Sequence, residues 1–175
     1  MAEWWRKNNK KIPLHLKEFQ RIVAFFVYQC PVQYKDGRKV TPRAVSFEEK
    51  NIIAAKQTSL LNSMKSKIEH KECYKPCNSM QDIMEFEKSC RKKYPAENHV
   101  EFIAYIPDPE LEKTRTIFYS LRNSLAHGSF SFVDSKNGER FYYFEAAKGN
   151  NIKARYCLSE RTLMKWIQIT EEVLS

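Results

Sequence analysis

The residues best suited to chemistry in this sequence are Arg122 and His127, which lie in the stretch Leu121–Gly128. A guanidinium matches phosphate oxygens and keeps its charge, and an imidazole can transfer a proton near neutral pH. On one continuous helix, two residues five apart lie about 140° apart around the axis and about 7.5 Å along it. We expect Gly128 to overcome this separation, because a glycine past the last turn can take a positive φ and let the histidine swing away from its helical direction. A histidine beside such a glycine also complements the helix dipole, so a purely structural role stays open.

A long amphipathic helix has to position these two groups. We expect it to begin at Asp108-Pro109, because aspartate suits the cap and proline at the first helical position loses no needed N–H. Arg115 and Tyr119 lie seven and three residues before Arg122, on nearly the same face of the helix. If Arg122 faces a cleft that binds RNA, Arg115 and Tyr119 are expected to flank it.

Three further helices are predicted ahead of this one. Apolar residues recur at helical spacing over residues 14–30 and predict the first helix. Ser46 and Glu49 form a capping box, which predicts that the second helix opens there and continues to about residue 68. Another capping signature opens a third helix over residues 79–94.

Strand signals are concentrated after Gly128. In residues 129–158 the apolar pattern changes to period two, and turn residues such as Asn137-Gly138 separate the candidate strands. This pattern predicts a small antiparallel meander, inserted before a last helix that Ser159 caps. The short apolar run at residues 100–106 leaves strand and helix open.

Composition favours one folded domain with a polyanionic partner. The chain has 175 residues, of which 42% are apolar and 13% aromatic, which fits a single domain over residues 1–175 and excludes a disordered chain. Residues 1–12 are expected to form a loose arm. Thirty basic residues against twenty-one acidic ones give a net charge of +9, which favours RNA as partner, although solubility alone could explain it.

Cysteine usage and the apolar runs point to a reducing cytoplasm. The five cysteines are scattered, no secretory signal is recognised, and the longest apolar run, residues 22–28, is too short to span a bilayer. One stretch contains possible metal ligands, namely His70, Cys73, Cys77, Cys90 and His99. Because no second tight pair of ligands closes a site, we expect reduced, partly buried thiols, with no metal and no cofactor.

The motif Arg122-Asn123-x-x-x-His127, closing a long amphipathic helix, resembles the R-x4-6-H signature of the HEPN superfamily, in which a polar residue often follows the arginine. The Ala126-His127-Gly128 ending is also similar to prokaryotic, often plasmid- or defence-associated, members of that superfamily. Together with the helical patterns, this resemblance implies a mainly α fold. We expect a HEPN-like bundle of four to five helices, with the small antiparallel β-meander inserted before the last helix.

The resemblance implies a metal-independent endoribonuclease, whose site forms between two HEPN domains and leaves 2′,3′-cyclic phosphate and 5′-hydroxyl ends. Arg122 and His127 would be catalytic, and Asn123 would orient the histidine or the phosphate. The chemistry agrees, because cleavage needs an acid, a base and positive charge on the phosphorane, and one histidine does not comfortably supply both proton transfers. A homodimer with two-fold symmetry brings two motifs into one cleft.

Two other functions stay open. The protein is alternatively a catalytically inactive HEPN module for interaction or for nucleotide or RNA binding, or a small basic nucleic-acid-binding protein without turnover. HEPN toxins that a nucleotidyltransferase antitoxin neutralises carry a tyrosine two residues after the histidine, and Ser129 stands there. The resemblance therefore favours a general role in defence or stress over control by adenylylation.

Overall fold

The fold is described by a computed structural model that covers residues 15–175, so the arm predicted at residues 1–12 lies outside the described part. Its elements, in chain order, are α1 (Lys17–Val23), the π-helix η2 (Ala24–Tyr28), α2 (Ala54–Lys65), the 3₁₀ turn η3 (Lys71–Cys73), β1 (Tyr74–Pro76), α3 (Met80–Lys93), β2 (Phe102–Tyr105), α4 (Lys113–Ala126), β3 (Phe130–Asp134), β4 (Arg140–Lys148), β5 (Asn151–Ser159) and α5 (Glu160–Leu174). No helix in residues 15–175 has the length and apolarity needed to cross a bilayer.

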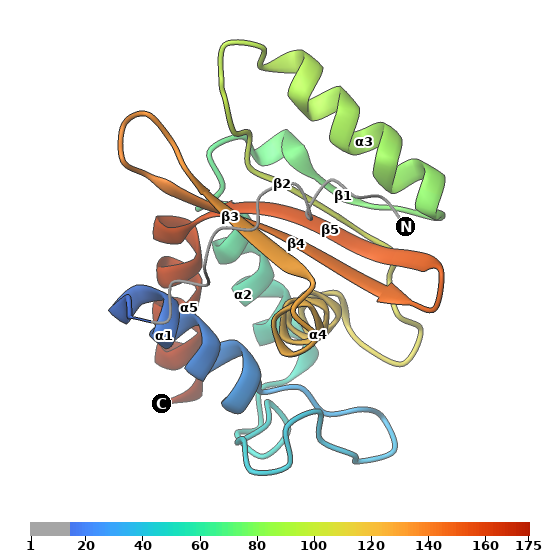
Figure 1. Cartoon of the computed structure of the whole chain (residues 1–175). Helices are drawn as coiled ribbons and strands as arrows, with labels where there is room; N and C mark the ends of the chain where they lie inside the picture. Colours follow the sequence, from blue (N-terminus) through green and yellow to red (C-terminus); the bar gives the residue numbers. More distant parts are fainter. Residues whose placement is uncertain (1–14) are drawn as a thin grey trace.

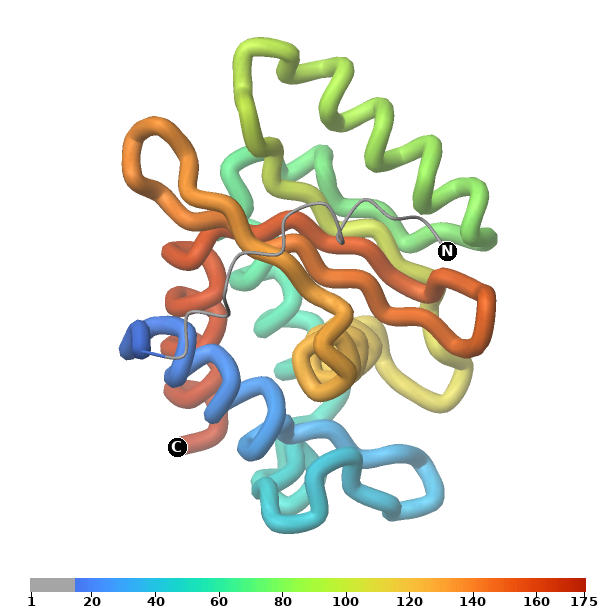
Figure 2. The backbone as a smooth tube through the Cα atoms, in the orientation of Figure 1, coloured from blue at the N-terminus to red at the C-terminus, as the bar shows by residue number. Residues whose placement is uncertain are grey.

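A five-stranded mixed sheet lies at the centre of the molecule (Figure 1). Its strand order is β1-β2-β5-β4-β3, with β1 parallel to β2 and every other neighbouring pair antiparallel. Helix α3 packs on one face, while α1, α2, α4 and α5 pack on the other (Figure 2). The strands thus form the middle layer of three.

The prediction of a mainly α HEPN-like bundle is therefore wrong. The meander expected as an insertion at residues 129–158 does form, but it makes up three strands of the sheet, with β3 at one edge, and β2 extends it by pairing Phe102 with Cys157. The alternation that marks these strands buries both faces: Tyr142 and Phe144 point into the core shared with α1, α2, α4 and α5, whereas Tyr143 points into the core shared with α3. A sheet with two apolar faces needs a helical layer on each side.

Several local signals are realised where the sequence places them. Ser79 Oγ accepts a hydrogen bond from the Asp82 N–H at 3.1 Å and caps α3. Ser159 Oγ accepts from the Thr162 N–H at 3.1 Å and caps α5. The apolar run at residues 100–106, which left two possibilities open, forms strand β2.

Two predicted helix starts are displaced along the chain. The Ser46–Glu49 capping box forms both of its hydrogen bonds, at 2.8 and 3.2 Å, but Asn51 takes a φ of 53° and closes the turn after a few residues. Helix α2 then begins only at Ala54. Asp108 likewise accepts from the Glu110 N–H at 2.8 Å in a tight turn, and α4 begins four residues beyond Pro109, at Lys113. Both caps support isolated turns, because a local hydrogen bond does not force the helix to continue.

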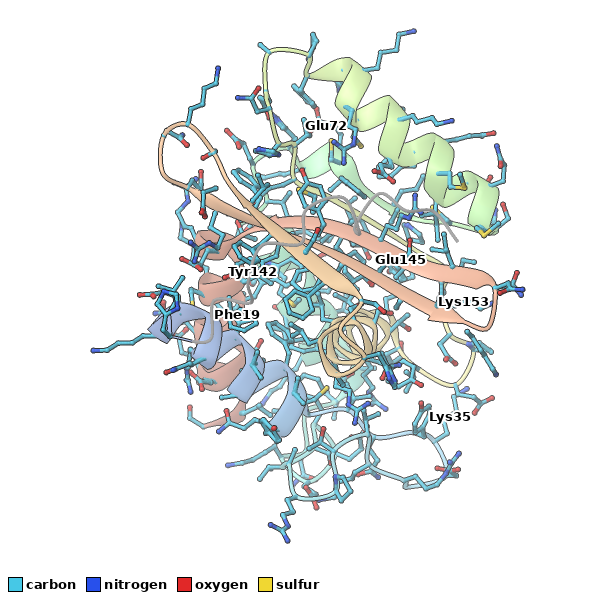
Figure 3. The ribbon with its side chains drawn as sticks, in the orientation of Figure 1. Phe19, Lys35, Glu72, Tyr142, Glu145 and Lys153 are labelled. Atoms are coloured by element: carbon cyan, nitrogen blue, oxygen red, sulfur yellow. The ribbon has the colours of Figure 1, made fainter. Side chains whose placement is uncertain are left out.

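Aromatic packing holds α4 against the rest of its layer. The ring of Phe118 lies 5.7–6.1 Å from the rings of Phe25, Phe26 and Phe47, all in the buried core. On the same side of the sheet, Phe19 of α1 stacks on Tyr142 of β4 at 6.0 Å (Figure 3). Such contacts add about 0.5–1.5 kcal/mol per pair to the area they bury, so the orientation of α4 is well determined.

A buried ionic network attaches α3 to the opposite face. Arg155 of β5, 4% exposed, pairs with Glu145 of β4 at 2.9 Å and with Glu87 of α3 at 3.0 Å. Glu87 also pairs with Arg91 at 3.1 Å. Glu145 and Arg155 are directly opposite each other in the β4–β5 register, so the pair joins two neighbouring strands and the covering helix at one point.

Replacing Arg155 with alanine should lower the free energy of unfolding by about 3–5 kcal/mol, because it removes the buried cation between Glu145 and Glu87 and leaves Glu87 paired with Arg91 alone. Urea denaturation monitored by circular dichroism measures this change. The matched control is Arg161→Ala, whose guanidinium is 64% exposed beside Glu139 and should cost less than about 1 kcal/mol. Equal costs for the two variants would contradict the role assigned to the network.

Candidate functional site

The motif lies at the C-terminal end of α4, where the helix closes in a Schellman turn. The Ser129 N–H donates to the Ser124 carbonyl at 2.8 Å, the Gly128 N–H donates to the Leu125 carbonyl at 3.2 Å, and Gly128 has a φ of 65°. His127 is the C-cap and is exposed. Its imidazole has no polar partner among residues 15–175 and is free to meet a ligand or a second chain.

Gly128 does not redirect His127, contrary to the expectation from the sequence. The His127 N–H still donates to the Asn123 carbonyl at 3.0 Å, as in a helical turn, while its φ and ψ of −96° and 4° lie outside the α-helical region, as befits a C-cap. The positive φ of Gly128 turns only the chain that follows, toward β3. His127 therefore stays in the last turn of α4, where ideal helix geometry places it about 140° around the axis from Arg122.

Arg122 is half-buried and only partly satisfied by the protein. Its Nη1 donates to Asn123 Oδ1 at 3.1 Å, while its Nε is buried and has no hydrogen-bond partner. No carboxylate within residues 15–175 forms an ion pair with it. Burial raises the pKa of the nearby Cys30 thiol to about 12, and the positive charge of Arg122 opposes that rise. The guanidinium thus presents a charge without a counterion.

The structure brings Arg122 and Asn123 together but does not join either side chain to His127. Asn123 orients the guanidinium and makes no contact with the imidazole. A proton-transfer group and a cation can meet around one phosphate here in two ways: the substrate bridges them across the helix end, or a second chain supplies one of them.

Arg115 is engaged within the protein. Its Nε donates to Gln57 Oε1 at 2.9 Å, its Nη1 donates to the Gln33 carbonyl at 3.3 Å, and Nη1 lies 2.5 Å from Glu48 Oε1. The side chain is 14% exposed. These contacts tie α4 to α2 and to the loop of residues 31–52, so the geometry assigns Arg115 a positioning role. An RNA contact by Arg115 stays a prediction.

Tyr119 is half-buried against the same loop. Its ring lies 5.7 Å from that of Tyr34 at 73°, in an edge-to-face contact, and the guanidinium of Arg38 lies 5.3 Å from the Tyr34 ring centre. Burial and a hydrogen bond with Tyr119 both raise the pKa of Tyr34. The predicted flanking position of Tyr119 beside Arg122 is compatible with this geometry, and an RNA contact by Tyr119 also stays a prediction.

Sequence reasoning missed the residues that hold this face of α4. These residues are Gln33, Glu48 and Gln57, which lie 58 to 82 positions before Arg115 in the chain. Glu48 lies in the turn that the capping box closes. Neither Gln33 nor Gln57 belongs to a recognisable motif. Gln57 is 1% exposed, although the residue type is usually found at the surface. Its burial could be inferred only after the partner of Arg115 was known.

A cavity of about 340 Å³ lies at the other end of α4, between α2 and the first helical turn. Lys65, Tyr74 and Lys113 contribute to its lining, and Lys65 lies 4.1 Å from the centre of the Tyr74 ring. None of the predicted site residues lines this cavity. At the C-terminal end, residues 126–128 are exposed, and Arg122 and Asn123 are half-buried.

All five cysteines are buried and none forms a disulfide. Burial raises the pKa of the thiols of Cys73, Cys77, Cys90 and Cys157, the first of them to about 12. His99 contacts the Tyr143 hydroxyl at 2.8 Å. The thiols and imidazoles that could have formed a cysteine-rich zinc site are thus not gathered around one point in the described chain.

Thiol-labelling reagent at pH 8 should modify none of the five cysteines in the folded protein, since the thiolate is the reactive form and burial opposes both its formation and access. All five should react in urea. Counting the released chromophore before and after unfolding measures this. Rapid labelling of any cysteine in the folded state would contradict the packing described.

Comparison with protein-family models, with curated protein sequences and with solved structures finds no match for this chain. The HEPN resemblance accordingly rests on the residues Arg122, Asn123 and His127 alone.

Proposed function

We propose that the protein is a metal-independent endoribonuclease, in which Arg122, Asn123 and His127 from two copies of the chain form one cleavage site. Arg122 would bind the scissile phosphate and stabilise the phosphorane, with Asn123 orienting its guanidinium. His127 of each protomer would transfer a proton, one removing the 2′-hydroxyl proton and the other protonating the leaving 5′-oxygen. The products would carry 2′,3′-cyclic phosphate and 5′-hydroxyl ends.

The unsatisfied guanidinium of Arg122 carries this proposal. A buried N–H without an acceptor costs about 1–3 kcal/mol, and a phosphate oxygen is an acceptor of the matching charge and geometry. The net charge of +9 favours the same class of ligand. An exposed imidazole five residues further along the chain supplies a group that can accept and donate a proton.

A dimer is part of the proposal because the helix geometry separates the two groups. Within one chain His127 projects about 140° around the axis of α4 from Arg122, and one imidazole would have to act as both acid and base. A two-fold axis beside the end of α4 would place the imidazole of one protomer near the guanidinium of its partner. The exposed residues 126–128 offer the surface on which the copies would approach.

The same separation favours one alternative, a binding module without turnover. If the ends of the two α4 helices do not meet, Arg122 still binds a phosphate, but no proton-transfer group reaches the scissile bond. Such a protein binds RNA and leaves it intact.

We place the protein in a reducing cytoplasm, with a role in defence or stress. The five free thiols support the compartment. The motif's likeness to defence-associated HEPN proteins supports the role.

Arg122→Ala and His127→Ala should each reduce RNA cleavage at least about a hundredfold in the presence of EDTA, since removal of a charge-stabilising or proton-transferring group has this scale of effect. Gel analysis of end-labelled RNA with terminal-phosphate mapping measures the rate and identifies the ends. Arg43→Ala and His15→Ala are matched controls, because both residues are exposed and lie outside the motif, and they should cleave normally.

Circular dichroism and size-exclusion chromatography with light scattering establish that the variants remain folded and report their oligomeric state. Activity per chain should rise with protein concentration until the dimer is saturated. Full activity in either motif variant, or in a strict monomer, would contradict the composite site. RNA binding without cleavage that is lost on Arg122→Ala would establish the binding module instead.

A further inference from the structure

A second cluster of polar side chains lies beneath the C-terminal end of α3, away from the motif. Glu69 and His70 precede η3, and Glu97 follows α3. Each of the three offers one atom that can bind a metal ion, a carboxylate oxygen or an imidazole nitrogen, and these atoms all lie within 4.8 Å of one another. His70 Nε2 and Glu97 Oε1 are 2.7 Å apart. This is the one group of three or more such side chains that residues 15–175 bring together.

The imidazole of His70 is held in place by Tyr94 on one face of the ring and by Glu97 at Nε2. The ring of Tyr94 stacks on it at 3.6 Å with an interplanar angle of 9°. The Tyr94 hydroxyl donates to the carboxylate of Glu72, which Lys93 also binds at 2.8 Å. Lys93 thereby neutralises Glu72 and leaves the charges of Glu69 and Glu97 unbalanced. Because these contacts fix the imidazole ring, His70 would lose little conformational entropy when its nitrogen binds a ligand. Contacts behind the ligands orient metal-binding histidines in the same way.

The backbone on both sides of the cluster is also fixed. The Glu69 N–H donates to Glu101 Oε2 at 2.9 Å, and the other oxygen of Glu101, itself 3% exposed, accepts from the Ser159 N–H at 2.8 Å. The Glu97 N–H donates to the Tyr94 carbonyl at 3.1 Å. The carboxylates of residues 69 and 97 are therefore presented by two anchored turns.

The charge in this cluster lacks a balancing partner. Glu97 Oε2 is buried and accepts no hydrogen bond within residues 15–175. His70 Nε2 contacts the other oxygen of this carboxylate, Oε1, and so does not satisfy the buried one. A buried carboxylate oxygen without a donor is costly, and a cation removes that cost.

We propose that Glu69, His70 and Glu97 bind a zinc ion through two carboxylate oxygens and one imidazole nitrogen, with the fourth position open to water. Zinc takes nitrogen and oxygen ligands at about 2.0–2.2 Å, so neighbouring ligand atoms in a tetrahedron lie about 3.3–3.5 Å apart. The ligand atoms of this cluster lie within 4.8 Å of one another, and His70 Nε2 and Glu97 Oε1, now 2.7 Å apart, would separate by less than 1 Å to reach this spacing. An imidazole in the set favours zinc over magnesium or calcium, which prefer oxygen alone. The ion would join the turn before η3 to the turn after α3.

Isothermal titration of the full, reduced and EDTA-stripped chain with zinc chloride tests this. We expect one zinc ion per chain, and at least about a tenfold loss of affinity in His70→Ala and in Glu97→Gln, since even second-layer substitutions at metal sites reach that size. His15→Ala, an exposed histidine outside the cluster, is the matched control and should bind zinc as the unmodified chain does. Zinc should also raise the melting temperature of the chain, but not of His70→Ala.

Cobalt substitution identifies the ligand atoms, because a thiolate ligand adds a strong charge-transfer band that carboxylate and imidazole lack. The proposal predicts a cobalt spectrum without that band. It is overturned if the chain binds no zinc, if His70→Ala and Glu97→Gln bind it undiminished, or if the thiolate band appears. Because the proposed cleavage needs no metal, His70→Ala should cleave RNA normally and His127→Ala should bind zinc normally, so each proposal can fail alone.

Discussion

The two-sided burial of β4 and β5 is the constraint on which the rest of this structure depends. Along each strand successive side chains enter opposite cores, so neither face can be left to water. One face of the sheet is covered by four helices, α1, α2, α4 and α5, and the other face by α3 alone. The two layers are attached to the sheet by different kinds of contact. The larger layer is packed through aromatic rings around Phe118, whereas α3 is attached at its centre by Arg155, Glu145 and Glu87. An ionic attachment specifies one position of the helix more sharply than aliphatic packing would, because its charges tolerate little displacement.

The sequence predicts local structure here better than it predicts the sheet. The helices α3 and α5 start at their predicted caps, and the three strands after Gly128 form as expected. The fold class was missed because β1 has three residues, Tyr74 to Pro76, without an alternating pattern, and because β2 is too short to be distinguished from a helix. From the sequence alone, a three-stranded meander cannot be distinguished from part of a larger sheet, because the strand that pairs with its edge is not identified. That partner, Phe102 opposite Cys157, is separated from it by more than fifty residues of chain.

The candidate site divides in the same way between local and long-range information. The helix that carries Arg122 and the turn at Gly128 follow from spacing and from glycine's freedom at positive φ. Spacing does not predict which side chains on this helix are free to bind a ligand. Arg115, for example, is held by partners from distant segments, namely Gln33, Glu48 and Gln57. Arg122 and Arg115 share a face of α4, yet one lacks a counterion and the other has several partners. Charge on a helix face therefore says little about ligand binding until the opposing loop is placed.

The position of His127 follows from hydrogen bonding in the last turn of α4. Its N–H must donate to Asn123 to close that turn, and this bond fixes where the side chain leaves the helix. Within a single chain, either the substrate has to bridge Arg122 and His127 across the helix end, or the turn has to unwind, which would forfeit the paired bonds of the Schellman motif. Two chains achieve the same meeting without disturbing either helix. If this site is catalytic, the geometry of the turn thus makes assembly of two chains the less costly route to activity, and it couples the activity to protein concentration.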